Sequence, residues 1–250
     1  MKVNFLIVGT QKGGSSALTK FIRQHPQIGL TFKKEGHFFD NDDYFQNEEV
    51  NYSIYHKNWE HILLNSAKLN QCKIYGEKTP TYMYWKECME RIKEYNHEMK
   101  LIFILRNPID RAYSQWNMNI EKNREFLSFS KALYMEKIRI LTSKNGDRAY
   151  SYIKRGYYSQ QIKRIMKIFS PKQMLFLKTE DLKNNHQETL DCVFNFLEVD
   201  TFKTIEFEMV NSCEYPPMDQ YDREFLRQKF AQEIVDLENL LGWDLSNWKM

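Results

Sequence analysis

Residues 3–22 read VNFLIVGTQKGGSSALTKFI, and this stretch decides the fold. The apolar run Val3 to Val8 predicts a buried strand, and Ser15 to Gln24 predicts an amphipathic helix. Between them lies Gly9-Thr10-Gln11-Lys12-Gly13-Gly14-Ser15-Ser16, a glycine-rich turn. This layout aims backbone N–H groups and a helix N-terminus at an anion. The segment therefore predicts a P-loop-like anion cradle, the alternative being a turn that only joins a strand to a helix.

Similar apolar runs recur along the chain with helical stretches between them. They are Lys73 to Tyr75, Leu101 to Leu105 and Met174 to Leu177, and a shorter strand is expected over Ile28 to Phe32. Further helices are expected over Tyr82 to Tyr95, Ile109 to Lys122, Tyr158 to Phe169, Gln187 to Leu197 and Arg223 to Leu241. Continuous apolar strands suit a parallel sheet covered on both faces. We therefore expect an α/β fold, a three-layer sandwich with a central, mainly parallel sheet.

Composition limits the classes of protein that remain. The chain has 250 residues, of which 42% are hydrophobic, and its net charge is +3, so we expect a single domain over residues 1–250 and no nucleic-acid or membrane partner. The cysteines at positions 72, 88, 192 and 213 form no CxxC pair, which favours a reducing compartment. The first apolar run is too short for a signal peptide, so we expect a cytoplasmic protein, whose oligomeric state stays open.

The turn departs from the loop of ATPases and GTPases. Gly9 and Gly14 fit the spacing G-x-x-x-x-G-K-[ST], but Ser15 occupies the lysine position and the lysine has moved to Lys12. The strand Leu101 to Leu105 ends in Arg106 instead of an acidic magnesium ligand. Both departures disfavour a P-loop nucleotide kinase and favour chemistry without a metal.

A second anion site is expected within residues 101–116, which read LIFILRNPIDRAYSQW. Arg106 follows the strand, and Ser114 comes eight residues later in a helix opened by a proline. An arginine fork and a hydroxyl suit a terminal phosphate. The alternative is that Arg106 and Arg111 form surface pairs with Asp110 or Glu121.

Together these segments resemble the sulfotransferases that use 3′-phosphoadenosine-5′-phosphosulfate (PAPS), most closely the branch with bacterial and heparan sulfate enzymes. TQKGGSSAL (10–18) resembles the family's 5′-phosphosulfate loop, and RNPIDRAYSQW (106–116) its 3′-phosphate motif. Four more segments occur in the family's order, namely KKEGHFFD (33–40), GEKTPTY (76–82), YIKRGYYSQQI (152–162) and YPPMDQYDREFL (215–226). The resemblance runs almost end to end.

The resemblance implies which residues bind PAPS. The 5′-phosphosulfate is expected on Lys12, Gly13, Gly14, Ser15, Ser16 and Ala17. Arg106 and Ser114 are expected to hold the 3′-phosphate, and Tyr157 to approach the donor. Heparan-type members carry a Lys-Gly-Arg stretch where this chain has Asn211-Ser212-Cys213-Glu214, so donor contacts there are in doubt.

An acid–base group is expected near Glu35 and His37, which lie two apart in a segment taken as extended, so that both side chains point the same way. Either can accept the acceptor's proton, and the surrounding aromatic residues are expected to raise the pKa of Glu35 towards neutrality. The resemblance favours Glu35 as the base, with His37 orienting it. The alternative for His37 is a hydrogen-bonded core histidine. Lys78 is expected in the same cleft, the alternative being an exposed lysine paired with Glu77.

These residues suggest an in-line sulfuryl transfer without a metal. Glu35 accepts the proton, Lys12 neutralises the leaving oxygen, and Ser15 and Ser16 hold the sulfonate oxygens with backbone N–H groups. The alternative that is not an enzyme is a non-catalytic nucleotide-binding module.

The acceptor is expected to be a small molecule with a hydroxyl or amine group, such as a natural product. Five of the ten residues from Asp40 to Glu49 are acidic, and carboxylates near the site would repel a polyanionic chain. The alternatives are a plain solvated loop and a carbohydrate acceptor.

Overall fold

The computed structural model describes residues 2–30, 35–46, 49–63, 72–143, 146–203 and 215–249, with the backbone alone at 58–63. Contacts divide the chain into two compact units. Unit 1 comprises Met1–Leu105 and Ile165–Ser212, and unit 2 comprises Arg106–Arg164 and Cys213–Met250. A single domain over residues 1–250 stays a prediction.

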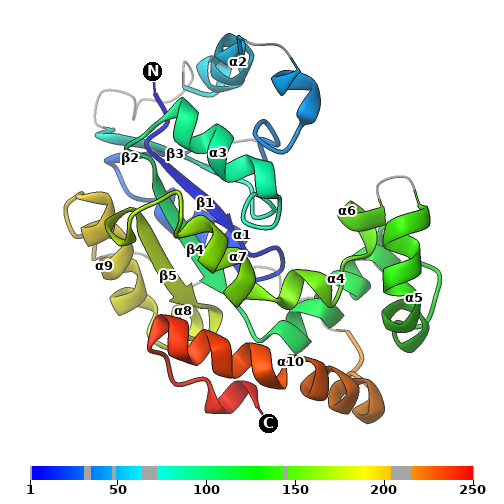
Figure 1. Ribbon diagram of the computed structural model, residues 1–250. Helices are drawn as coiled ribbons and strands as arrows, with labels where there is room; N and C mark the ends of the chain where they lie inside the picture. Colours follow the sequence, from blue (N-terminus) through cyan, green and yellow to red (C-terminus); the bar gives the residue numbers. More distant parts are fainter. Residues whose placement is uncertain are drawn as a thin grey trace. The chain divides into compact units, whose positions relative to one another are not determined.

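Unit 1 contains a parallel sheet of five strands in the order β2-β3-β1-β4-β5 (Figure 1). The strands are β1 (Phe5–Gly9), β2 (Ile28–Leu30), β3 (Ile74–Lys78), β4 (Lys100–Leu105) and β5 (Met174–Lys178). The expected parallel sheet is confirmed. The strand β3 extends three residues beyond its predicted end, because its pairing with β1 continues to Lys78.

Helices cover both faces of this sheet. On one face Phe5, Ile7 and Ile102 join a core with α1 (Ser15–Ile22) and α9 (His186–Leu197). On the opposite face lies α3 (Lys86–Tyr95), which buries Cys88, Met89 and Ile92 (Figure 1). Unit 1 thus has the three layers of the expected α/β sandwich, and β1 at its centre delivers the glycine-rich turn.

Unit 2 is helical in the part that the structure describes. Its helices are α4 (Pro108–Glu121), α5 (Phe129–Thr142), α6 (Gly146–Tyr150), η2 (Lys154–Gly156), α7 (Tyr158–Ile165, of which the last residue belongs to unit 1), α10 (Gln220–Leu241) and η4 (Ser246–Trp248). The buried carboxylate of Glu233 on α10 accepts the N–H and the hydroxyl of Ser159, at 2.6 and 2.8 Å. This contact fixes the start of α7 against α10.

Two regions without a clear periodic pattern in the sequence contain helices. Residues 40–55 include η1 (Asp42–Phe45) and the start of α2 (Tyr52–Leu63), and residues 142–152 include α6. The helix α2 lacks a clear apolar period in the sequence, but Tyr55 packs on Phe38 and Phe39 with ring centroids 4.8 and 5.2 Å apart. Tertiary packing therefore stabilises what the local pattern does not. The remaining short helices of unit 1 are η3 (Pro171–Gln173) and α8 (Thr179–Asn184).

Candidate active site

The glycine-rich turn folds tightly onto the end of the sheet. The Thr10 N–H donates to Ile104 O at 2.8 Å, and the Gly13 N–H donates to Thr10 O at 2.9 Å. Lys12 and Gly14 adopt positive φ of 68° and 96°. A Cβ at Gly13 would collide with Ile104 O, so only glycine lets the turn lie this close to β4.

The turn leads into α1 with its N-terminus prepared for an anion. Gly14 is the N-cap, and the first helical hydrogen bond runs from the Leu18 N–H to Gly14 O. The preceding N–H groups of the first turn have no acceptor within the helix, and no acidic side chain lies there. The hydroxyl of Thr179, the first residue of α8, donates to Gly13 O at 2.5 Å and holds the turn in place. The predicted residues Lys12 to Ala17, termed the anion cradle, lie at this helix N-terminus, and their binding of an anion stays a prediction.

Glu35, His37 and Asp40 form a chain of hydrogen bonds beside this cradle, in unit 1. His37 Nε2 lies 2.9 Å from Glu35 Oε2, and His37 Nδ1 lies 3.0 Å from Asp40 Oδ2. Asp40 is buried and also accepts from the Thr81 hydroxyl at 3.2 Å. Glu35 and His37 meet as expected, but not in an extended segment, because His37 adopts φ 51°.

The two carboxylates keep His37 positively charged. Hydrogen bonds to Asp40 and Glu35 outweigh burial and raise the pKa of His37 to about 10. Burial alone would raise the pKa of Glu35, but the hydrogen bond with His37 and the charge of Lys78 lower it below its ordinary value. The expectation of a Glu35 pKa near neutrality is therefore wrong. Glu35 is therefore ionised at neutral pH.

Lys78 connects the acid–base group to the anion cradle. Its Nζ lies 3.6 Å from Glu35 Oε1 and 3.5 Å from Ser16 Oγ, and the side chain is only 6% exposed. The alternative of an exposed lysine paired with Glu77 is wrong, because Lys78 is buried and pairs with Glu35. One cation therefore lies between the candidate base and the first turn of α1.

In unit 2 the candidate 3′-phosphate residues lie on different elements. Arg106 directly follows β4 and accepts at its carbonyl oxygen from the Tyr158 hydroxyl at 3.0 Å, whereas Ser114 is buried on α4. Tyr157 follows η2, with its ring 5.5 Å from that of Phe230. That these three residues bind one donor stays a prediction.

The surface pairs considered as an alternative for the unit 2 arginines are not found at Arg111. Its side chain is fully buried, with Nη1 donating to Gln115 at 2.7 Å and Nη2 donating to Tyr152 O. Asp110 pairs instead with Arg223 at 3.0 Å. Arg111 therefore holds Tyr152 beside α4.

Sequence reasoning missed Asp40, Thr179 and Glu77 as parts of the site. Asp40 stands three residues after His37, a spacing that suggests a hydrogen bond between them. Thr179 and Glu77 are far in sequence from Gly13 and Gly36, and only the tertiary fold brings each pair into contact. Two predictions fall outside the described residues, namely the strand beyond Leu30 and the donor loop Asn211 to Glu214. Among the described residues no group of three His, Cys, Asp or Glu side chains is arranged to hold a metal. Within the same part of the chain no helix is long and apolar enough to cross a membrane.

The fold agrees with the comparisons. The chain belongs to the sulfotransferase family, since the model of the sulfotransferase domain matches residues 2–221. The crystal structure of a sulfotransferase from Alicyclobacillus acidocaldarius superposes with a TM-score of 0.85 at 27% identity, covering 100% of both chains.

Two curated relatives come from Mus musculus and Homo sapiens. Heparan sulfate glucosamine 3-O-sulfotransferase 3B1 of Mus musculus is 30% identical over 194 residues, which are 77% of this chain and 45% of that protein. Heparan sulfate glucosamine 3-O-sulfotransferase 6 of Homo sapiens is 30% identical over 198 residues, or 77% of this chain and 51% of that protein. The chain thus spans about half the length of the curated relatives it matches.

Proposed function

We propose that this chain transfers a sulfuryl group from PAPS to a hydroxyl or amine group of a small acceptor. One observation carries the proposal, namely that buried Lys78 contacts both Glu35 and Ser16. The candidate base and the cradle expected to hold the sulfuryl group therefore share one cation. That arrangement suits a reaction in which a proton leaves the nucleophile while negative charge develops on the group being transferred.

The roles of the residues in unit 1 follow from their chemistry. PAPS supplies an activated sulfuryl group on a phosphate leaving group. The Lys12 ammonium and the N–H groups at the start of α1 stabilise negative charge there, with Ser15 and Ser16 as further donors. Glu35 accepts the acceptor's proton, and His37, held between Glu35 and Asp40, orients it. None of the residues assigned to these steps needs a metal ion for its role.

The family assignment supports this class of reaction over the two rivals. A P-loop kinase is disfavoured, because Ser15 occupies the position of the kinase lysine. A non-catalytic binding module would have no use for an ionised, half-buried Glu35 beside a buried lysine. Arg106, Ser114 and Tyr157 are proposed to bind the end of PAPS that carries the 3′-phosphate.

Arg106→Ala tests the donor assignment. We expect it to weaken binding of 3′,5′-adenosine bisphosphate by about tenfold or more, as for a lost charge-assisted hydrogen bond, and to change binding of 5′-AMP little. Isothermal titration calorimetry on both ligands measures this difference. Arg223→Ala is a matched control, because it removes an arginine of unit 2 that pairs with Asp110. Equal losses for both ligands in Arg106→Ala would refute the assignment.

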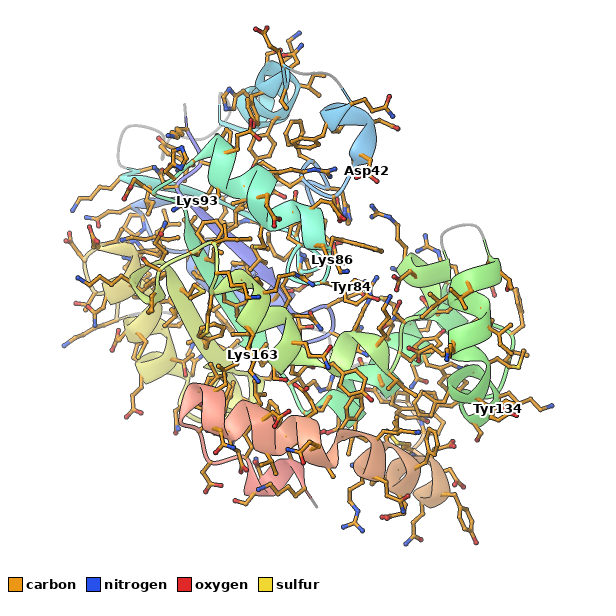
Figure 2. The ribbon with its side chains drawn as sticks, in the orientation of Figure 1. Asp42, Tyr84, Lys86, Lys93, Tyr134 and Lys163 are labelled. Atoms are coloured by element: carbon orange, nitrogen blue, oxygen red, sulfur yellow. The ribbon has the colours of Figure 1, made fainter. Side chains whose placement is uncertain are left out.

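The charge of unit 1 supports a small acceptor. Exposed carboxylates on η1 and α3 include Asp42, Glu87, Glu90 and Glu94, and three of them line a hollow of about 430 Å³ together with Lys86 and Arg91. Figure 2 shows Asp42 and Lys86 at this surface. Because Arg91 pairs with Asp42 at 2.7 Å, the glutamates of α3 carry the excess negative charge that disfavours a polyanionic chain. The second candidate is a carbohydrate acceptor, which the names of the heparan sulfate relatives favour.

A comparison of acceptors separates the two candidates. We expect kcat/KM for small alcohols and amines to exceed that for heparan-type oligosaccharides, because the exposed carboxylates of α3 repel a sulfated chain. The double variant Glu87→Gln with Glu90→Gln should raise activity on the oligosaccharide more than activity on the small acceptors. A clear preference of the unaltered protein for the oligosaccharide would overturn the small acceptor and leave sulfuryl transfer intact.

A further inference from the structure

Two buried side-chain hydroxyls accept hydrogen bonds from four consecutive backbone N–H groups, in the segment that carries Glu35 and His37. The Gly36 N–H donates to Thr79 Oγ1 at 2.9 Å, and the His37 N–H donates to the same oxygen at 3.4 Å. The N–H groups of Phe38 and Phe39 donate to the Tyr82 hydroxyl at 3.0 and 3.4 Å. All these residues lie in unit 1.

The carboxylate of Glu77 determines how these two hydroxyls are oriented. Thr79 Oγ1 lies 2.5 Å from Glu77 Oε1, and the Tyr82 hydroxyl lies 3.2 Å from the same oxygen. A hydroxyl has one proton to donate and two lone pairs to accept with. Because both protons point at Glu77, the lone pairs of both oxygens face the N–H groups of residues 36–39.

The Glu77 group is sealed from water and packed closely. Glu77, Thr79 and Tyr82 are all 0% exposed. A Cβ at Gly36 would collide with Glu77 Oε1, so the segment lies directly on the carboxylate. The Gly36 N–H also donates to Glu77 Oε1 at 3.1 Å. Burial raises the pKa of Glu77, and hydrogen bonds from Thr79, Tyr55 and Tyr82 oppose that rise.

We propose that Glu77, Thr79 and Tyr82 are positioning residues, a platform that sets Glu35 and His37 for proton transfer to Glu35. The proposal rests on the proposed function. The platform holds backbone on both sides of His37, whose φ of 51° aims its ring between Glu35 and Asp40. Since Lys78 adjoins both Glu77 and Thr79 in β3 and the turn after it, the same stretch of chain also places the lysine that contacts Glu35.

The chain offers a matched pair of tyrosines for the test. Tyr55 and Tyr82 are both buried, both donate to Glu77, and both pack against Phe39 with ring centroids 5.2 and 5.6 Å apart. Tyr55 donates to Glu77 Oε2 at 2.6 Å. Gly36, Thr79 and Tyr82 donate instead to the other oxygen, Glu77 Oε1. Tyr55→Phe and Tyr82→Phe therefore each remove one hydroxyl that donates to Glu77, but only the Tyr82 hydroxyl also accepts from the N–H groups of Phe38 and Phe39.

Amide hydrogen exchange measures directly how firmly the backbone of residues 36–39 is held, and it needs no sulfuryl acceptor. In Tyr82→Phe we expect the amides of Phe38 and Phe39 to exchange roughly tenfold faster or more, the effect of losing one buried hydrogen-bond acceptor. In Tyr55→Phe these amides should exchange as in the unaltered protein. Unchanged exchange in Tyr82→Phe, or the same increase in both variants, would overturn the platform.

A second pair of variants at position 79 reports on the charged group. Thr79→Val keeps the shape and removes the hydroxyl, whereas Thr79→Ser keeps the hydroxyl. We expect the pKa of His37, followed by NMR, to remain at about 10 in Thr79→Ser and to fall towards its ordinary value of 6.5 in Thr79→Val. A structural role without positioning would lower thermal stability in Thr79→Val and leave the His37 pKa in place, and that result would contradict the proposal.

Turnover connects the platform to catalysis. With the best small alcohol or amine from the acceptor comparison, Tyr82→Phe and Thr79→Val should lose kcat at least tenfold with little change in the KM for PAPS, and Thr79→Ser should recover most of it. Equal loss in Tyr55→Phe would contradict the proposal. Unaltered protein that transfers no sulfuryl group would instead contradict the proposed function, and the exchange and titration results distinguish that failure from a failure of the platform.

Discussion

Lys12→Ala is expected to lower sulfuryl transfer by about a hundredfold or more, the effect of deleting one donor that acts on developing charge. The Lys12 ammonium is proposed to neutralise the oxygen that leaves sulfur, so its loss acts on kcat more than on PAPS binding. Alanine keeps a Cβ at the positive φ of 68°, which leaves the backbone cost of this position unchanged. Steady-state kinetics with PAPS measure the loss.

A neighbouring lysine provides the control for this charge removal. Lys20 is exposed on α1, and Lys20→Ala removes one positive charge close in sequence to Lys12. We expect Lys20→Ala to retain near-normal turnover and Lys12→Ala to retain the thermal stability of the unaltered protein. Near-normal turnover in a folded Lys12→Ala variant would contradict the role assigned to Lys12.

Glu35→Gln is the second change with a large expected effect. General-base catalysis typically contributes about 10²- to 10⁴-fold, and glutamine keeps the size of the side chain while it removes the basic oxygen. We expect a loss of kcat in that range with binding of 3′,5′-adenosine bisphosphate retained. Glu98→Gln, an exposed glutamate of unit 1 before β4, is the matched control and should leave turnover unchanged.

The pH dependence follows from the direction of the pKa shifts. The pKa of Glu35 is lowered below its ordinary value of 4.5, so the base is ionised throughout the neutral range and is lost only as the pH falls below that value. The raised His37 pKa favours the folded state at pH below 6.5, and that contribution is lost as the pH rises through about 10. Turnover that falls between pH 7 and 6 with the titration of Glu35 would contradict this assignment.

Local sequence signals predict the sheet and the tight glycine-rich turn after β1 well. The strands β1, β4 and β5 are short apolar runs, and the glycines after β1 mark a turn that must approach backbone closely, as Gly13 does at Ile104 O. The extension of β3 was missed because Gly76, Glu77 and Lys78 carry no strand signal of their own. Their pairing with β1 decides that conformation, which is a tertiary effect.

The electrostatics of the site could not be predicted in the same way. The aromatic residues next to Glu35 are visible in the sequence and suggested a raised pKa. The lowering comes from His37 and Lys78, and Lys78 stands 43 positions along the chain and reaches Glu35 only through the sheet. Glu77 was missed for the same reason, since its partners come from three separate segments around Gly36, Tyr55 and Thr79.

The most direct test of the central claim is transfer of radiolabelled sulfate from PAPS to a pool of small alcohols, amines and saccharides by the purified chain. We predict a labelled acceptor product together with 3′,5′-adenosine bisphosphate, formed equally well with a chelator present and lost in Lys12→Ala and Glu35→Gln. ATP with Mg²⁺ should yield no phosphorylated acceptor under the same conditions. Tight binding of 3′,5′-adenosine bisphosphate without transfer to any acceptor would contradict the account, as would phosphoryl transfer from ATP.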